Sequence, residues 1–345
     1  MYMKKILITS LKLGASLAIL AYLIWKATST RGPNNVDVFT NLVEEPKDWW
    51  MLFWAWAFSA AAVVLTFIRW WYLVRALDIP CRFSDGIRIG FWGFLFNLSP
   101  LGIVGGDLVK AVMLAHEHRQ YRAKAAASVL FDRIIGLYIL FVLASAAILF
   151  TGFWRLKEPE IHVTCVLTFI VTIGGALGIA LMYVPGVLDG PLSRALGRLP
   201  RVGRLITSLI NAVGLYRYKP VVLVVSTLIC FVVQCLFATS IYLIARGLPG
   251  DVLSLGAHFV VWPLSSAAGV IPLSIGPTEF VLDFLYSHVP QAGVVIPAGQ
   301  GLVVALCYRL ISVLVTALGI GYYIGNRREV SQAIHEDEKN SLAAE

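Results

Sequence analysis

The stretch NLSPLGIVGGDLVK, residues 97–110, interrupts what would otherwise be a continuous membrane helix. The apolar run before it is too short to cross a bilayer, which takes about 20 residues. Pro100 removes a backbone donor, and Gly102, Gly105 and Gly106 allow conformations that other residues avoid. Broken backbone at membrane depth is tolerated only where it is buried in protein or lines a wet cavity. The stretch therefore predicts a broken, re-entrant helix.

A second stretch half a chain later, residues 270–281 (VIPLSIGPTEFV), repeats this pattern. Its helix-breaking residues are Pro272, Gly276 and Pro277. At an offset of 172 positions Pro100 falls on Pro272 and Asp107 falls on Glu279, so a proline-to-acid spacing of seven occurs twice. Paired hydrophobic segments that Gly or Pro interrupts in corresponding halves point to the binding site of a transporter.

The composition is that of a polytopic membrane protein, because 58% of the 345 residues are hydrophobic and only 14% are charged. The net charge of +8 follows membrane topology. Of the 28 Lys and Arg residues, 20 fall in segments assigned to the inside and 6 in segments assigned to the outside, and Arg133 and Arg309 lie within apolar helices. This distribution indicates membrane insertion and no nucleic-acid partner.

The apolar segments predict six spanning helices, at 1–25, 49–69, 125–150, 163–184, 221–245 and 303–324. Trp49-Trp50 and Trp70-Trp71 lie 20 residues apart and are expected to mark the two interfaces of the second helix. We expect an all-α polytopic membrane protein with a single transmembrane domain, in which about six spanning helices and two re-entrant broken helices form inverted repeats. The expected parts are repeat one at about 49–150, repeat two at about 221–325, a cytoplasmic amphipathic segment at 191–219 and a cytoplasmic tail at 326–345.

An arginine follows each break inside an apolar helix, Arg133 in the first half and Arg309 in the second. An intramembrane ionisable residue is a functional hypothesis by default, and a guanidinium fork suits phosphate. The competing interpretation is that these arginines reach an interface or pair structurally with Asp132 or Tyr308.

The acids of the two breaks allow two compatible interpretations. Asp107 and Glu279 either cap the helices that restart after each break or belong to helix N-termini that meet an anion in mid-protein. Lys110, one turn beyond Asp107, either pairs with it or faces a head group. The predicted substrate-binding residues are Arg133, Arg309, Asp107, Glu279, Lys110, Asp132 and Tyr308.

No nucleophile–base set, Walker loop or D-x-D pair occurs in the chain. The sequence His116-Glu117-His118 is a charged turn with no further ligand nearby, so we expect no metal and no cofactor.

Three stretches of the chain resemble the lysylphosphatidylglycerol synthase transmembrane region, a flippase-like domain family. They are Ser99 to Lys110, Ser128 to Leu137 with its Asp132-Arg133, and Ile271 to Glu279. The resemblance covers nearly the whole chain and implies a lipid-translocating fold. It matches motif positions at Asp107, Arg133, Glu279 and Arg309. In place of a glycine-rich turn with an arginine before the acid, this chain has Gly276-Pro277-Thr278-Glu279. The soluble aminoacyl-transferring domain has no counterpart in these 345 residues, so we expect no lipid lysylation.

We therefore expect a lipid flippase-like transporter of the inner (cytoplasmic) membrane that moves an anionic or polyprenyl-linked lipid between leaflets. The expected partner is a phospholipid or polyprenyl phosphate, alongside envelope-synthesis proteins or further copies of the chain. Two alternatives stay open: a membrane-embedded glycosyl- or phospho-transferase acting on a lipid carrier, and a non-catalytic subunit of an envelope-synthesis complex.

Six crossings place both termini in the cytoplasm, because the second break returns to the side from which it enters. Reporter fusions at each terminus should therefore both read as cytoplasmic. A C-terminus on the opposite side would make the second break a full crossing and would contradict the inverted arrangement.

Overall fold

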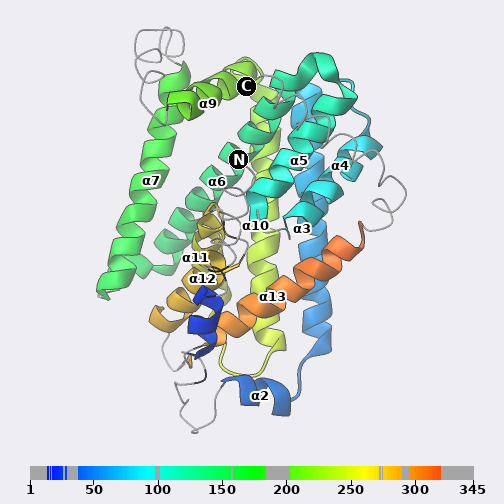
Figure 1. Ribbon diagram of the computed structural model, residues 1–345. Helices are drawn as coiled ribbons and strands as arrows, with labels where there is room; N and C mark the ends of the chain where they lie inside the picture. Colours follow the sequence, from blue (N-terminus) through cyan, green and yellow to red (C-terminus); the bar gives the residue numbers. More distant parts are fainter. Residues whose placement is uncertain are drawn as a thin grey trace.

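A computed structural model of the protein describes residues 14, 16, 18–25, 28, 38–97, 102–156, 158–183, 203–271, 273, 275–289, 296–297 and 299–319. These residues form a helical bundle without a β-strand (Figure 1). Five described helices are long and apolar enough to cross a membrane, namely α3 (Trp49–Ala76), α6 (Arg122–Thr151), α7 (Pro159–Tyr183), α10 (Pro220–Gly247) and α13 (Gln300–Ala317). They coincide with five of the six predicted spans, and the first, 1–25, lies largely outside the described residues. The expected all-α polytopic membrane fold is confirmed.

Four shorter helices lie between the spans and flank the two predicted breaks. They are α4 (Phe83–Phe96), α5 (Gly102–Glu117), α11 (Leu255–Ala268) and α12 (Pro277–His288). At 1.5 Å per residue the longest of them rises about 24 Å, less than the roughly 30 Å of a hydrocarbon core. Pro100 and Pro272 themselves lie outside the described residues.

The remaining described elements join the spans at the ends of the bundle. They are α2 (Val38–Glu44), α9 (Gly203–Tyr216) and the 3-10 turns Arg119–Tyr121 and Phe153–Arg155. Helix α9 lies across one end of the bundle (Figure 1), and it covers the second part of the predicted amphipathic segment. Tyr216 at its end stacks on Phe131 of α6, with 4.2 Å between ring centroids.

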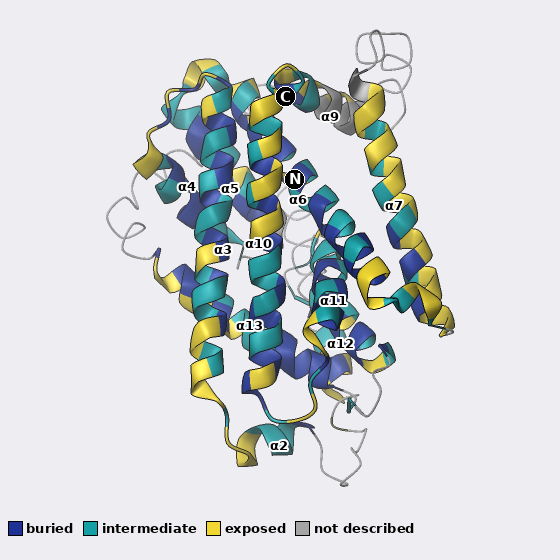
Figure 2. Cartoon of the chain, turned by 180° about the vertical axis from the view of Figure 1, so that it is seen from behind, coloured by how far each residue is buried: buried dark blue, intermediate teal, exposed yellow. Residues whose placement is uncertain are grey.

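Helices α3 and α10 run antiparallel through the middle of the bundle. The main-chain nitrogen of Asp48 donates to the carbonyl oxygen of Gly247 at 3.0 Å. Farther along the two helices, the hydroxyls of Ser59 and Ser240 lie 2.8 Å apart. The short pair α4–α5 lies towards one end of these helices and α11–α12 towards the other (Figures 1 and 2). Helix α7 lies at the edge and exposes most of its apolar side chains (Figure 2), as a lipid-facing helix would.

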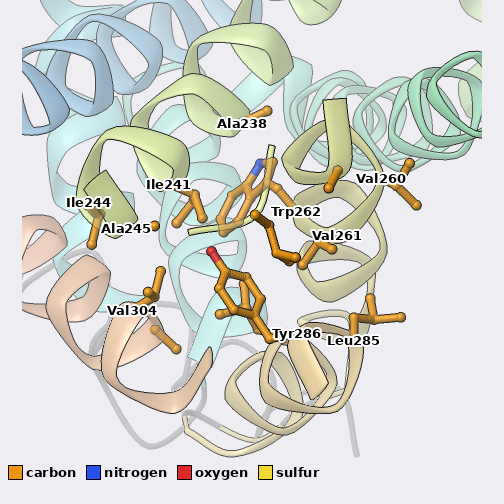
Figure 3. Close-up of a cluster of buried hydrophobic side chains, with 14 of the residues drawn as sticks. Ala238, Ile241, Ile244, Ala245, Val260, Val261, Trp262, Leu285, Tyr286 and Val304 are labelled. Atoms are coloured by element: carbon orange, nitrogen blue, oxygen red, sulfur yellow. The ribbon is translucent and has the colours of Figure 1, made fainter. Parts of the chain in front are cut away.

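In the largest hydrophobic cluster of the described residues, aliphatic side chains surround two aromatic rings where α10, α11, α12 and α13 meet (Figure 3). Trp262 and Tyr286 lie at its centre and are almost fully buried. The fully buried His258 bonds to the Tyr286 hydroxyl through Nε2 at 2.5 Å and to the Ser254 carbonyl through Nδ1 at 2.9 Å. These bonds satisfy polar atoms that would otherwise be costly to bury, and they fasten α12 to α11.

The structure corrects the predicted end of the second spanning helix. Helix α3 continues to Ala76, seven residues beyond the predicted end at Arg69. Trp49 and Trp50 are 74% and 63% exposed, which suits an interfacial belt, but Trp70 is 0% exposed. The prediction that Trp70 lies at the second interface was wrong, because its ring packs in a second hydrophobic cluster between α3, α4, α5, α6 and α9.

The glycines of the first stretch also serve a different purpose from the predicted one. Gly105 and Gly106 lie inside α5, which begins at Gly102, so the helix break is shorter than the sequence indicated. A Cβ atom on Gly106 would overlap the Gly93 carbonyl oxygen and the Asn97 side chain of the preceding helix segment. Gly106 therefore permits close packing of α4 on α5.

Gly106→Ala should destabilise the protein by about 1–3 kcal/mol, the usual cost of forcing an extra methyl into a packed contact. Gly174→Ala in α7 is the matched control, because a Cβ atom at Gly174 meets nothing within 4 Å. Thermal unfolding in detergent should show a lower midpoint for the first variant only. Equal midpoints would contradict the close approach of α4 and α5.

Candidate functional site

In the first half of the chain the predicted arginine contacts the acid of the preceding break. Arg133 of α6 grips Asp107 of α5 with two bonds: Nη2 donates to Oδ1 at 2.8 Å, and Nε donates to Oδ2. The Arg133 side chain is 43% exposed and the Asp107 side chain 18%. The pair thus joins a short helix to a spanning helix while part of the guanidinium stays accessible.

The second half contains the corresponding pair. Arg309 of α13 donates from Nη2 to Oε1 of Glu279 on α12, and the carboxylate is 3% exposed while the arginine is 31% exposed. The other carboxylate oxygen, Oε2, accepts from the backbone nitrogen of Gly276 at 2.8 Å. Gly276 has φ of 121°, a conformation that favours glycine, and it is the residue before α12 begins. Glu279 therefore both caps α12 and holds Arg309.

The capping interpretation was wrong for Asp107. Helix α5 begins five residues earlier, at Gly102, and has no acid in its first turn. The difference arises because the first break is shorter than predicted, so Asp107 sits one turn farther into its helix than Glu279 does. Its carboxylate is used by Arg133 instead.

A third ion pair was not predicted. Arg69 of α3 donates from Nε to Asp132 Oδ1 at 2.7 Å, and both side chains are less than a tenth exposed. Asp132 therefore pairs with Arg69 and not with the adjacent Arg133. The sequence predicts Arg69 at the end of the second spanning helix, because the tryptophans that follow it suggest a membrane interface. The run of apolar residues that continues beyond them was the signal for a longer helix.

Lys110 is 6% exposed and forms no ion pair with a carboxylate among the described residues, so the first of its two alternatives, pairing with Asp107, is not realised. Its ammonium lies 5.7 Å from the ring centroids of both Phe67 and Trp70 on α3. It is close enough to the two carboxylates, Asp107 and Asp132, to interact with them electrostatically. Lys110 and Arg69 thus belong to the buried part of the bundle.

Tyr308 packs against aromatic rings, whereas its neighbour Arg309 forms an ion pair. Its ring packs edge-on against Trp262 at 4.9 Å and against Phe237 at 6.3 Å between ring centroids. The competing interpretation, in which Arg309 pairs with Tyr308, is not realised, because Arg309 pairs with Glu279. Tyr308 forms part of the wall between α10, α11 and α13.

The described residues contain no group of three His, Cys, Asp or Glu side chains arranged to hold a metal ion. Glu117, the last residue of α5, accepts a hydrogen bond from Arg88 of α4 at 2.6 Å, which holds the two helices together away from the break. The charged groups of the site are thus arginine–carboxylate pairs and one lysine. Such groups can bind an anionic head group, since a phosphate oxygen can replace a carboxylate oxygen on a guanidinium fork.

Comparison with known proteins places these residues in a family context. A family model described as "Lysylphosphatidylglycerol synthase TM region" matches residues 13–319, which include all three ion pairs. Neither the curated proteins nor the solved structures contain a match to the chain.

Asp132→Asn should destabilise the protein by about 3–5 kcal/mol, because it leaves Arg69 buried without a counter-charge. The matched control is Asp78→Asn, which removes an exposed carboxylate from its contact with Lys219 and should leave the midpoint unchanged. Thermal unfolding in detergent measures both. Equal shifts would show that the Arg69–Asp132 pair contributes no more than a surface contact.

Proposed function

This chain belongs to the family of lysylphosphatidylglycerol synthase TM regions, and on that premise we propose that it moves an anionic or polyprenyl-linked lipid between membrane leaflets. The observation that carries the proposal is the recurrence of one arginine–carboxylate pair, partly accessible at the arginine, beside each helix break. We place the protein in the cytoplasmic (inner) membrane with both termini on the cytoplasmic side.

In this proposal the chain consists of two inverted repeats, α3 to α6 and α10 to α13. Helices α3 and α10 each have 28 residues, and α4 and α11 each have 14. Helix α11 begins 172 positions after α4, the offset that aligns the two sequence breaks. The antiparallel course of α3 and α10 supports the inversion, because equivalent helices of inverted repeats run in opposite directions.

The short pairs α4–α5 and α11–α12 would then be the re-entrant elements that enter from opposite sides. Support comes from their lengths, which are below what a span requires, and from their positions towards opposite ends of α3 and α10 (Figure 1). Each carries its acid, Asp107 or Glu279, close to the break. A lipid head group could thus meet one arginine–carboxylate pair from each side of the membrane.

The pairs supply a means of binding that never leaves an arginine without an anionic partner. When no lipid is bound, Asp107 and Glu279 neutralise Arg133 and Arg309. An arriving phosphate would compete with the carboxylate for the guanidinium, and the carboxylate would take the arginine back when the phosphate leaves. Exchange of one partner for another keeps an anion on each arginine throughout, and so avoids the large cost of a bare guanidinium in a low-dielectric site.

The test is lipid movement in vesicles that contain the purified protein and a labelled anionic lipid. Arg133→Ala and Arg309→Ala should each slow movement by about ten- to hundredfold, since a charge-assisted hydrogen bond contributes about 1.5–3 kcal/mol. Lysine at either position should restore little, because it lacks the planar fork. Arg246→Ala is the control, because Arg246 is exposed and bonds only weakly to Tyr242 at 3.4 Å.

Full lipid movement in the Arg133→Ala, Arg309→Ala double variant would contradict the proposal. If the wild-type protein moves no lipid but forms product from a nucleotide sugar or polyprenyl phosphate, the transferase alternative holds. Inertness in both assays would favour the non-catalytic subunit.

A further inference from the structure

The two candidate half-sites are the Asp107–Arg133 pair and the Glu279–Arg309 pair, each with the residues beside it. They differ in charge, although their ion pairs correspond. Lys110 lies three residues after Asp107, and the residue three after Glu279 is the buried Leu282. Asp132 directly precedes Arg133, and Tyr308 directly precedes Arg309. The first half-site therefore carries additional ionisable groups where the second has an aliphatic side chain and an aromatic ring.

The first half-site has one positive charge more than its carboxylates can compensate. Its ionisable side chains are Lys110 and the four charged groups that interact with it electrostatically, namely Arg69, Asp107, Asp132 and Arg133. Each carboxylate grips an arginine, so Lys110 is the cation left over. With three cations and two carboxylates, the formal charge of the group is +1.

Lys110 is held in place but has no ion pair with a carboxylate among the described residues. Its side chain is 94% buried, being 6% exposed, and its ammonium has only the π faces of Phe67 and Trp70 as close partners in the described part of the chain. Ring faces attract the charge, but they accept its N–H groups poorly compared with an oxygen. The aliphatic stem is fixed against Gly93, where an added Cβ would come within 2.7 Å of the Lys110 Cγ atom. Such a buried cation destabilises the lipid-free protein unless an anion completes its surroundings.

We infer that Lys110 is the residue that selects the head group: the first half-site takes a phosphodiester lipid with one net negative charge and discriminates against zwitterionic lipids. This inference rests on the proposed lipid-binding function. A phosphodiester anion brings the formal charge of the site to zero and supplies oxygen acceptors to Lys110 and Arg133. A zwitterionic lipid carries an ammonium or choline group as well, which the net positive charge of the site repels. The second half-site, with Leu282 in place of the lysine, imposes no such selection.

The test compares thermal unfolding and lipid binding of the full chain in neutral detergent, with phosphatidylglycerol and phosphatidylethanolamine as the added lipids. The wild-type protein should bind phosphatidylglycerol in preference, by at least about tenfold, as one charged hydrogen bond allows. Lys110→Met should abolish that preference, and Lys110→Arg should keep part of it. Lys110→Met should also unfold at a higher temperature than wild type without lipid, because it removes a buried, unsatisfied cation.

Lys124→Met is the matched control. Lys124 also lies over an aromatic ring, 5.4 Å from the Tyr121 centroid, but it donates to the Leu77 carbonyl and lies outside the first half-site. It should keep the lipid preference of wild type. A lower lipid-free unfolding temperature for Lys110→Met would show a structural role for the ammonium and overturn the inference.

Unchanged lipid preference in Lys110→Met would overturn it equally. So would binding of glycerophosphoglycerol, the soluble head group, as tightly as the intact lipid, since the ligand would then be a free anion. The proposed function is tested separately. If the protein shows a Lys110-dependent lipid preference but moves no lipid in vesicles, this inference stands and the proposed transport activity does not.

Discussion

A charge inside a bilayer must find its counter-charge within the protein, and this constraint organises the described structure. Three arginine–carboxylate pairs meet it: Arg69 with Asp132, Arg133 with Asp107, and Arg309 with Glu279. Each pair joins two different helices, so the same bonds that neutralise charge also fix helix positions. The pairs link α3 to α6, α5 to α6, and α13 to α12.

The three pairs differ in burial, and this difference separates a structural pair from the two pairs proposed to bind lipid. The Arg69–Asp132 pair is almost completely buried and holds α3 against α6. Arg133 and Arg309 are 43% and 31% exposed, although their carboxylates are more buried. A guanidinium that is accessible on one side can exchange partners, whereas a buried pair cannot do so without disrupting the core. The candidate binding function therefore belongs to the two pairs beside the breaks.

Much of the fold could be predicted from the sequence, because hydrophobic length and helix breakers act locally. The proline-to-acid spacing located the short helices, and the apolar runs located five described spans. The sequence marked Asp107 and Arg133 as candidate binding residues. It could not show that they pair with each other, because that depends on which helices become neighbours. Arg69 was missed because Trp70 resembles an interfacial residue until its burial between helices is known. Gly106 was assigned to a flexible break for a similar reason, since close packing of α4 on α5 is a tertiary property.

The most direct test of this account exchanges the two charges of the first pair, with Arg in place of Asp107 and Asp in place of Arg133, and measures the unfolding midpoint beside lipid movement. Each single substitution places two like charges together and should lower the midpoint strongly. The exchanged protein should recover most of the midpoint but not the lipid movement, because the arginine then projects from the short helix instead of from α6. A midpoint no higher than that of the single variants would contradict a direct Asp107–Arg133 interaction. Full lipid movement by the exchanged protein would contradict the role given to the position of Arg133.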